Sequence, residues 1–449
     1  MEKFKRAVVM AVGSGGDVAP LAAVAEKLAA HGMDTTLMAP QRYRRFTAGT
    51  AVQFQSIGAD DVFEEVFNGA DVWSAAKGLQ ASWRYYGAAM RTGLSALRRG
   101  WHAADTLLVS SSFAVAARLA EELDAYRNTT VHLSPSIVFS AHRPPKWPAA
   151  SIPGHWPLWL KRVAIAAAER CGTDPVIGAH VNAFRAELGL PPVRKLFSQW
   201  IHSPRRVVYA FPEWFAQAAP DWPAHGAFTG FPSCPQPQRA LPAALEAFLQ
   251  GGSGPVMVIT AGTAVASRPQ WVERLASFAV AQGARVVVIE PNAQGDTAGA
   301  AVHSVPFAPF DLLLPRVQLI AHHAGIGTMA EALRAGLPQL LVPSAHDQPD
   351  NAWRLQHLGL GHSLGQDPGP GDLTRAWHWA LGNGPLRQAL HDAQARIARE
   401  EEGAGCIAEL VLADCGARDG QGSDEGGQRI PGMRRGGDAR LQNAYRYKT

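Results

Sequence analysis

Cysteine, charge and long apolar runs are all scarce in this 449-residue sequence. The four cysteines form no C-x-x-C pair, which argues against a disulfide scaffold and a zinc site and favours a reducing compartment, the cytoplasm. The most apolar stretch, residues 156–168, is interrupted by Lys161 and Arg162, whereas a helix that crosses a bilayer needs about 20 apolar residues. Apolar residues still make up 47% of the chain, so a mostly disordered protein is excluded.

Two signatures of nucleotide chemistry are missing as well. There is no D-x-D sequence, so the usual carboxylate pair that holds a metal on a nucleotide diphosphate is absent, and no metal site is expected. A dinucleotide fingerprint would need a third glycine where Val18 stands and an acid near Ala39, so an NAD-dependent dehydrogenase is disfavoured. His322 and His323 are neighbours on an expected strand and point to opposite faces, which argues against a shared metal ion.

Positive charge is concentrated in the last part of the chain. Residues 416–449 carry six arginines and one lysine against four acids, a net +3 out of the +4 of the whole sequence. The rest of the chain is therefore close to neutral, and no nucleic-acid-binding surface is expected on it. Because this tail is rich in Gly and Arg and poor in apolar residues, we expect it to be disordered.

An alternation of apolar strands and helices predicts an α/β protein. The first series comprises strands at 6–12, 35–39, 106–109 and 129–133, helices at 18–31 and 114–123, and further helix within 158–188. After a Pro-rich segment the alternation restarts, with strands at 256–260, 284–289, 317–321 and 339–342 and helices at 270–282 and 325–335. We therefore expect two facing Rossmann-like domains, with an interdomain ligand cleft at the carboxyl ends of their strands.

The expected domain boundaries follow from the proline-rich segments. Residues 1–232 would form the first domain, 233–242 a Pro-rich linker, and 243–415 the second domain, whose last helix can pack back on the first. Residues 134–157 contain six prolines and are expected to form a long loop, of the kind that is often functional.

The first candidate site is the turn GSGGD, residues 13–17, which follows the first strand and precedes the first helix. It presents Asp17 at the edge of the sheet, near a helix N-terminus. One interpretation is that the carboxylate caps the helix, and the other is that it serves as a general base for a hydroxyl. The residues alone leave both interpretations open.

The second candidate site is HHAGIGTMAE, residues 322–331, where a strand ends and a helix is expected to begin near Thr328. Backbone N–H groups at a helix start suit a phosphate group, to which His323 and Thr328 can add side-chain donors. Thr328 and Glu331 also fit a capping box, which explains those two residues without a ligand. That alternative does not explain the small residues at 324, 325 and 327, which the close approach of a ligand would require.

The third candidate site, PSAHDQPDN at residues 343–351, follows the next strand and so lies on the same edge. If it stood alone, its polar side chains would be ordinary loop and capping residues. Beside a phosphate site, they are residue types that bind sugar hydroxyls.

Taken together, the three turns resemble those of inverting glycosyltransferases of the GT-B fold. The stretch GSGGDVAP, residues 13–20, is similar to the amino-terminal signature of the antibiotic and sterol glycosyltransferases in that class. Residues 322–333 and 338–352 resemble the donor-binding signature. A closer resemblance, to the rhamnosyltransferases of rhamnolipid biosynthesis, rests on residues 134–145, 197–204, 211–215 and 221–232.

The resemblance implies a role for each site residue. Asp17 matches the base that deprotonates the acceptor hydroxyl. Phe307 matches a position that packs on the nucleobase, although a core aromatic is the alternative interpretation. The other matched positions face the donor: Gly262, Thr263, His323, Gly325, Gly327 and Thr328 its diphosphate, Glu331 its ribose, and His346, Asp347 and Gln348 its sugar.

The resemblance also implies the reaction, which is transfer of L-rhamnose from dTDP-L-rhamnose to a hydroxyalkanoyloxy-alkanoic acid. A dTDP- or UDP-sugar would be the co-substrate, with no cofactor and no metal. The alternatives are a transferase for a sterol, polyketide or other apolar acceptor, and a non-catalytic nucleotide-sugar-binding partner. A nucleotide-sugar epimerase would not need an apolar acceptor site.

The acceptor is expected to bind in the first domain. Residues 70–101 and 134–159 are rich in tryptophan, tyrosine and small apolar residues and are the segments we expect to contact it. A lipid-like acceptor predicts peripheral contact with the inner face of the cell membrane, or association with the enzyme that makes the acceptor. The sequence shows no clear amphipathic anchor.

Overall fold

The computed structural model describes residues 4–74, 77–148, 151–233, 240–262, 268–290, 293, 297–298, 301–382 and 384–414. The described residues belong to one compact unit. Thr263, most of the expected linker and the tail 416–449 lie outside them, so the expectations for those residues stay predictions.

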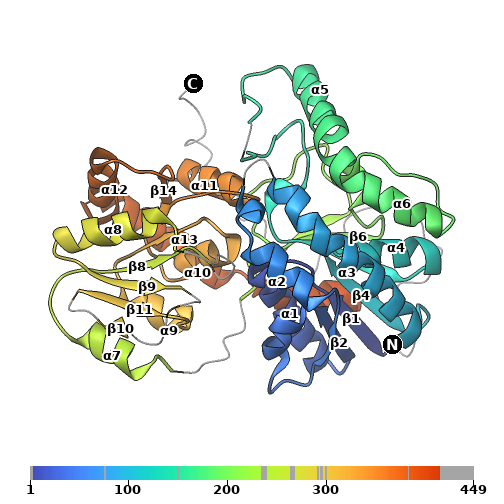
Figure 1. Cartoon of the computed structure of the whole chain (residues 1–449), viewed down its shortest axis with the longest axis horizontal. Coiled ribbons are helices and arrows are strands. Elements are labelled where there is room, and N and C mark those ends of the chain that lie inside the picture. The colour runs from blue at the N-terminus through green and yellow to red at the C-terminus, as the bar shows by residue number, and fades with distance from the viewer. Residues whose placement is uncertain are drawn as a thin grey trace. The chain divides into compact units, whose positions relative to one another are not determined.

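Seven parallel strands form the first sheet, in the order β3-β2-β1-β4-β5-β6-β7 (Figure 1). Strand β4 is buried along its whole length, as expected for a parallel sheet that helices cover on both faces. The strands of this first half are β1 (Arg6–Met10), β2 (Asp34–Ala39), β3 (Gln53–Ser56), β4 (Thr106–Ser111), β5 (Arg127–His132), β6 (Arg206–Tyr209) and β7 (Gly226–Phe228). Its helices are α1 (Gly15–Ala30), α2 (Asp60–Asn68), α3 (Gly78–Gly100), α4 (Val115–Asp124), α5 (Leu158–Ala168) and α6 (Ala179–Glu187).

The second sheet has the order β10-β11-β9-β8-β12-β13-β14. Only the two-residue edge strand β10 is antiparallel among the described strands. The strands of this second half are β8 (Val256–Thr260), β9 (Arg285–Ile289), β10 (Thr297–Ala298), β11 (Val302–Val305), β12 (Leu319–His322), β13 (Gln339–Leu341) and β14 (Gly361–Ser363). Its helices are α7 (Ala243–Gln250), α8 (Gln270–Ala281), α9 (Phe310–Leu313), α10 (Ile326–Arg334), α11 (Gln348–His357), α12 (Pro370–Gly382) and α13 (Gly384–Arg399).

Both sheets place their first strand in the middle. Without β10, each follows the 3-2-1-4-5-6 order of the doubly wound Rossmann fold, to which the first sheet adds β7. The predicted class, an α/β protein with two Rossmann-like sheets, is confirmed. No helix in the described part of the chain is long and apolar enough to cross a membrane.

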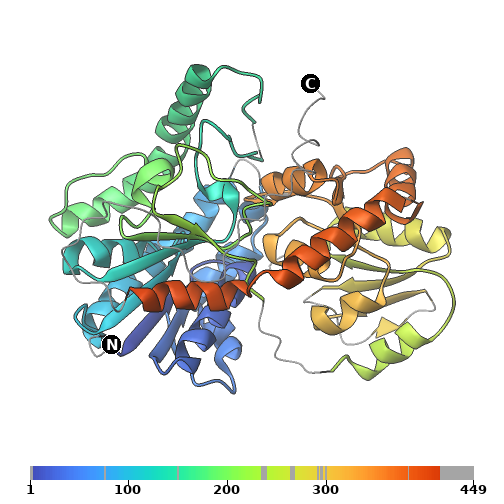
Figure 2. The ribbon, with the colours of Figure 1, turned by 180° about the vertical axis from the view of Figure 1, so that it is seen from behind.

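The last helix, α14 (Gly403–Ala413), returns to the first half of the chain. Ile407 and Val411 are buried in the same core as α1 and β1, and Figure 2 shows α14 in front of the strands of the first sheet. At its end, Asp414 accepts hydrogen bonds from the Arg206 guanidinium at 2.6 and 3.1 Å. The chain therefore crosses between the two sheets twice, once before α7 and once after α13.

The long helical stretch expected within residues 158–188 is interrupted by a different helical geometry. Residues 169–178 adopt a π-helix between α5 and α6. Glu169 is buried there, and its carboxylate accepts hydrogen bonds from the backbone N–H groups of Phe197 and Ser198 at 3.0 and 2.8 Å. These bonds tie the wider turn of helix to the segment that precedes β6.

Candidate active site

The expected site residues follow the carboxyl ends of strands in both sheets. Asp17 follows β1 in the first half. In the second half, Gly262 follows β8, His323 follows β12, and residues 343–351 follow β13. Ligands of doubly wound sheets bind outside these strand ends, so the fold brings the three turns to the edges where a site is expected.

Asp17 is the third residue of α1, and one of its carboxylate oxygens turns back to the start of the helix. Oδ2 accepts hydrogen bonds from the Ser14 backbone N–H at 2.7 Å and from the Ser14 hydroxyl at 3.0 Å. The capping interpretation is therefore correct for this oxygen. Oδ1 has no hydrogen-bond partner among the described residues. Burial raises the pKa of the carboxyl even though Ser14 donates to it, so the free oxygen is a stronger base than an ordinary aspartate.

Gly13 gives the Asp17 carboxylate its room. Its φ of +138° is one that side-chain-bearing residues rarely adopt. A Cβ atom at this position would lie 2.3 Å from Oδ2 of Asp17. A glycine is therefore needed here so that the carboxylate can fold back onto the turn.

His323 is held between two glycines of the donor turns. A Cβ atom on Gly262 would lie 2.6 Å from the Cε1 atom of the imidazole, and one on Gly325 would lie 2.4 Å from Nε2. Burial lowers the pKa of His323 to about 4, although a hydrogen bond with the Thr260 backbone opposes this. Its Nδ1 atom is buried and has no partner among the described residues. At neutral pH the ring is therefore neutral and can hydrogen-bond to a ligand, but it brings no positive charge.

The helix that follows this turn, α10, has an open N-terminus. Its N-cap is Gly325, so no side chain occupies the first backbone N–H groups of the helix. The helix begins at Ile326, within one residue of the predicted 325–335 helix and two residues before Thr328. Thr328 is therefore its third residue, and the alternative interpretation of Thr328 and Glu331 as a capping box is wrong. Gly327 and Thr328 both lie in this first turn. A helix start with unoccupied N–H groups is a suitable site for a phosphate.

Glu331 lies one turn further along α10. Its Oε1 atom accepts a hydrogen bond from Nη1 of Arg334 at 2.7 Å. Arg334 also donates to the backbone carbonyl of Phe231 at 2.5 Å. The contact with a ribose implied by the resemblance stays a prediction, and a ribose there would share the carboxylate with Arg334.

The third turn presents Asp347 and Gln348 in different ways. Oε1 of Gln348 accepts hydrogen bonds from the Ser344 backbone N–H at 2.9 Å and from the Ala345 N–H at 3.2 Å. The amide nitrogen of Gln348 has no hydrogen bond to any described residue. Oδ2 of Asp347 accepts from Nδ2 of Asn351 at 2.7 Å. Gln348 therefore keeps a donor free, whereas Asp347 keeps one oxygen free.

Asn351 connects the second and third turns. Its Nδ2 atom also donates to the Ala324 carbonyl at 3.1 Å. Ala324 and His346, one in each turn, have φ values of +66° and +56°. Such a backbone conformation costs free energy in a residue with a Cβ atom and is concentrated at functional sites. His346 contacts the first half: its ring meets that of Trp73 edge to face at 5.6 Å, and it hydrogen-bonds the Val72 backbone.

The charge of Asp17 acts on Asp347 although the two residues come from different halves. Burial and, to a smaller extent, the negative charge of Asp17 raise the pKa of Asp347 to about 7. Asp17 also raises the pKa of Tyr86 on α3. The structure thus brings the candidate base near the turn that would face the donor sugar.

Phe307 follows the end of β11 in the second half. Its side chain is partly exposed and belongs to none of the hydrophobic core clusters of the described residues. The core-aromatic interpretation is therefore not supported. The ring remains available for a nucleobase, and that role stays a prediction.

Sequence reasoning missed a chain of hydrogen bonds at the edge of the first sheet. The Ser112 hydroxyl, after β4, lies 2.9 Å from Nδ1 of His132, at the end of β5. Nε2 of His132 lies 2.8 Å from Nδ1 of His202. Burial lowers the pKa of His132 and brings that of His202 to about 4, so both rings are neutral. Ser112 is partly exposed and follows the strand next to β1, which places a held hydroxyl on the same edge as Asp17.

A second missed contact joins the Pro-rich loop of the first half to α11. Asp350 is buried, and its Oδ1 atom accepts a hydrogen bond from the Lys146 backbone N–H at 2.9 Å. Its Oδ2 atom accepts from Nε of Arg354 at 2.7 Å. The loop expected to be functional is therefore bonded to the helix that begins in the third turn.

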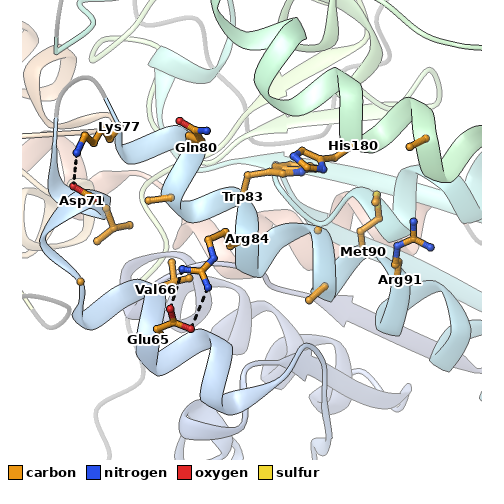
Figure 3. A pocket seen from close by; sticks show the side chains of 16 residues that line it. Glu65, Val66, Asp71, Lys77, Gln80, Trp83, Arg84, Met90, Arg91 and His180 are labelled. Carbon is orange, nitrogen blue, oxygen red and sulfur yellow. Dashed lines mark hydrogen bonds and ion pairs between the residues drawn. The ribbon is translucent and has the colours of Figure 1, made fainter.

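A cavity of about 1030 Å³ lies in the first half, between α2, α3 and α6 (Figure 3). Eleven of its sixteen lining residues fall within 70–101, one of the two segments expected to bind the acceptor. Trp83 forms part of the wall, with His180 stacked on it at 6.3 Å. The ring centroids of Tyr86 and Trp83 are 6.2 Å apart. Burial and the charge of Asp17 raise the pKa of Tyr86. Tyr86 thus lies behind the Trp83 wall of the cavity and within electrostatic range of the candidate base.

Two family models match the chain, one in each half. Residues 7–125 match the N-terminal domain of glycosyltransferase family 28. Residues 274–413 match the C-terminal domain of the erythromycin biosynthesis protein CIII-like family. The first model thus covers the strand and helix around the Asp17 turn, and the second covers the strands and helices around the other two candidate turns.

Two relatives match over most of the chain. An O-mycaminosyltylonolide 6-deoxyallosyltransferase of Streptomyces fradiae is 28% identical over 370 residues, which are 79% of this chain and 84% of the relative. The glycosyltransferase GtfC of Amycolatopsis orientalis is 29% identical over 422 residues, covering 91% and 97%.

Solved glycosyltransferase structures share the fold. The kitacinnamycin glycotransferase superposes with a TM-score of 0.69 at 17% identity, covering 92% of this chain and 99% of that one. The spinosyn rhamnosyltransferase SpnG, solved with thymidine diphosphate, gives 0.61 at 18% identity, covering 90% and 99%.

The fold and these matches define the class: the chain is a glycosyltransferase of the GT-B fold. Within that class it is similar to enzymes that glycosylate natural products, with an erythromycin biosynthesis protein CIII-like second half. None of the relatives named above is a rhamnolipid enzyme, so the closer resemblance expected from the sequence is not supported by them.

Proposed function

We propose that the chain is an inverting, nucleotide-sugar-dependent glycosyltransferase that moves a deoxysugar onto the hydroxyl of an apolar acceptor. The observation that carries this proposal is the electrostatic proximity of Asp17 to the third turn, which contains Asp347. A carboxyl with a raised pKa and a free oxygen lies within electrostatic range of Asp347, on the turn that resembles a sugar-binding turn. A general base on one half and a donor on the other are the parts that such a transfer needs.

The donor would bind at the start of α10. Unoccupied backbone N–H groups at Ile326 and the residues that follow would hold the diphosphate, and neutral His323 would hydrogen-bond to it. A dTDP-linked donor is supported by the thymidine diphosphate in the SpnG structure, and a deoxysugar is supported by the name of the deoxyallosyltransferase. The free amide of Gln348 would donate to a hydroxyl of the sugar.

The reaction then follows from these positions. Oδ1 of Asp17 takes the proton of the acceptor hydroxyl, and the resulting alkoxide attacks the anomeric carbon from the face opposite the diphosphate. The bond between that carbon and the diphosphate oxygen breaks, and the configuration inverts. The leaving diphosphate keeps its electron pair, and the N–H groups of α10 stabilise its charge.

The acceptor would occupy the cavity between α2, α3 and α6. Its buried wall residues Val66, Trp83 and Met90 are apolar or aromatic, while its rim carries paired charges such as Arg84 with Glu65 (Figure 3). An apolar body with a polar end fits this lining. Movement of Tyr86 would connect the cavity to Asp17.

Two acceptor classes remain in competition. The names of the relatives favour a polyketide or another apolar natural product. The four stretches quoted above favour the rhamnolipid precursor, a hydroxyalkanoyloxy-alkanoic acid, with dTDP-L-rhamnose as donor. Both require the same base and the same donor turns.

Mass spectrometry of reactions with purified protein separates these acceptors. The donors are dTDP-L-rhamnose and dTDP-glucose, and the acceptors are a hydroxyalkanoyloxy-alkanoic acid and a macrolide aglycone. A mono-rhamnosylated lipid establishes the rhamnolipid pair, and a glycosylated aglycone establishes the alternative. If no pair gives product while dTDP still binds, the chain is a nucleotide-sugar-binding partner and the proposal fails.

A further inference from the structure

The described residues include three large apolar side chains that are exposed to solvent: Trp159 at 66%, Val163 at 58% and Trp353 at 43%. Trp353 has neighbours that account for it, because Lys146 lies over its ring at 5.1 Å and His357 stacks on it at 5.1 Å. Trp159 and Val163 are four residues apart on α5 and have no such cover. Because the two side chains are neighbours on one helix face, they form a contiguous exposed apolar area, which is the feature that marks a candidate contact surface.

Helix α5 has one packed face and one open face. At 100° per residue, Trp159, Val163 and Ala166 fall on one stripe of α5, flanked by Arg162. Arg170 follows in the first turn of the π-helix, and all five residues are exposed. We call these five residues the α5 outer face. The opposite side packs into a small cluster through buried Ile165. Figures 1 and 2 both show α5 standing beyond the edge of the first sheet.

The charged side chains along this part of the chain are mostly positive. Residues 151–173 contain one carboxylate, Glu169, which is buried and bonded to the Phe197–Ser198 backbone. Against it stand Lys161, Arg162 and Arg170. The next acid, Asp174, accepts hydrogen bonds from the backbone N–H groups of Lys195 and Leu196. Aromatic, aliphatic and basic residues on one helix face are the combination that binds anionic lipid headgroups. Aromatic residues and arginine are also enriched at protein interfaces, so a second copy of the chain is the competing occupant that the test below separates.

We propose that the α5 outer face docks on an anionic lipid surface. Trp159 and Val163 would enter the interfacial region, and Arg162 and Arg170 would lie against the phosphate headgroups. The sequence shows no clear amphipathic anchor because alanines and arginines dilute the apolar stripe, and the exposure of Trp159 becomes visible only in the fold.

The position of this face suits an enzyme with a lipid-soluble acceptor, a link that rests on the proposed function. The chain runs without interruption from α5 through the π-helix into α6. His180 and Ala183 of α6 line the acceptor cavity. A lipid surface on α5 would therefore lie at one end of the helical stretch whose other end forms the wall of the cavity.

The test is co-sedimentation of the full chain with vesicles of phosphatidylcholine alone or with 30% phosphatidylglycerol, without donor or acceptor. We expect at least fivefold more binding to the anionic vesicles, and loss of that gain in 0.5 M NaCl. The double variant W159E/V163E should bind at least tenfold less. R162E/R170E should lose the preference for anionic lipid, whereas R375E/R387E, an equal change of exposed charge in the second half, should keep it.

Three results would overturn the proposal. The first is absence of binding to either vesicle, and the second is binding by W159E/V163E at the wild-type level. The third is a dimer in sedimentation velocity that W159E/V163E abolishes, which would assign the face to a second copy of the chain. Because vesicle binding is measured without turnover, its failure leaves the proposed transferase activity untouched. Loss of activity on a water-soluble acceptor would fault the transferase proposal alone.

Discussion

The two glycine-rich turns, one in each half, have the same architecture and opposite chemistry. Each leads from a central strand into a helix, α1 in the first half and α10 in the second. In α1 the third residue is Asp17, whose carboxylate accepts hydrogen bonds from the backbone N–H and the hydroxyl of Ser14, the N-cap residue. In α10 the third residue is Thr328, and the N-cap is a glycine, which has no side chain to accept hydrogen bonds from the first backbone N–H groups. One side chain at the third position thus separates a turn that carries a base from a turn that can receive an anion.

The largest effect is expected from Asp17→Asn, which keeps a cap oxygen but removes the base. General-base catalysis is typically worth about 10²–10⁴-fold, so kcat should fall by that factor while the KM for the donor changes little. Steady-state kinetics with a thermal melt as control checks this, because the asparagine should leave the melting temperature nearly unchanged. Activity close to wild type would reduce Asp17 to a helix cap.

A second change would make α10 resemble α1. Thr328→Asp places a carboxylate at the third helix position, where it competes with the diphosphate for the same N–H groups and repels its charge. We expect about 100-fold weaker donor binding with a helix that is no less stable. Thr328→Asn is the matched neutral control and should lose much less. Equal losses in both variants would show that the diphosphate does not bind at this helix start.

The pH dependence of donor binding sharpens the comparison further. Asp347 has a pKa of about 7, so it is mostly protonated at pH 6 and mostly ionised at pH 8.5. Its negative charge in a desolvated site repels the diphosphate, so the Kd for a dTDP-sugar should rise about fivefold over this range. Asp347→Asn should flatten the profile. Because His323 has a pKa of about 4, it stays neutral and should not contribute.

The smallest effect is expected from removal of metal ions. The sequence offers no D-x-D pair, and the described residues contain no group of three potential metal-ligating side chains. We therefore expect turnover in EDTA to stay within about twofold of that in Mg²⁺, since the α10 N-terminus would stabilise the leaving group. A loss that Mn²⁺ or Mg²⁺ restores would mean that a metal shares this task.

Local patterns predicted the framework of the fold and the three turns. Strand β8 was expected at the residues where it lies, and β1, β9, β12 and β13 within two residues at each end, because buried parallel strands are continuous apolar runs. The apolar pattern predicted a helix at 325–335, close to α10, but the turn chemistry put its start near Thr328 because Thr328 and Glu331 imitate a capping box, whereas the N-cap is Gly325. Glycine at an N-cap leaves no side-chain signal in a sequence.

Contacts between distant segments could not be predicted in this way. The hydrogen bond between Asp350 and Lys146 joins residues 204 positions apart. The series of hydrogen bonds from Ser112 through His132 to His202 joins three separate segments. Helices α2 and α3 form most of the cavity wall, yet neither was predicted. Gly, Ser and Ala interrupt the apolar periodicity of α3, whereas α2 (DDVFEEVFN) has a regular apolar stripe from which it could have been predicted. Their place is set by packing against the sheet, which no local window contains.

Binding of dTDP to wild type, Asp17→Asn and Thr328→Asp, measured by isothermal titration calorimetry beside a turnover assay, tests the division between the two turns most directly. We predict that Asp17→Asn binds dTDP within about twofold of wild type but does not turn over, and that Thr328→Asp loses about 100-fold in affinity. If Asp17→Asn loses binding and turnover together, or if Thr328→Asp binds as wild type does, the assignment of base and donor to separate turns is wrong.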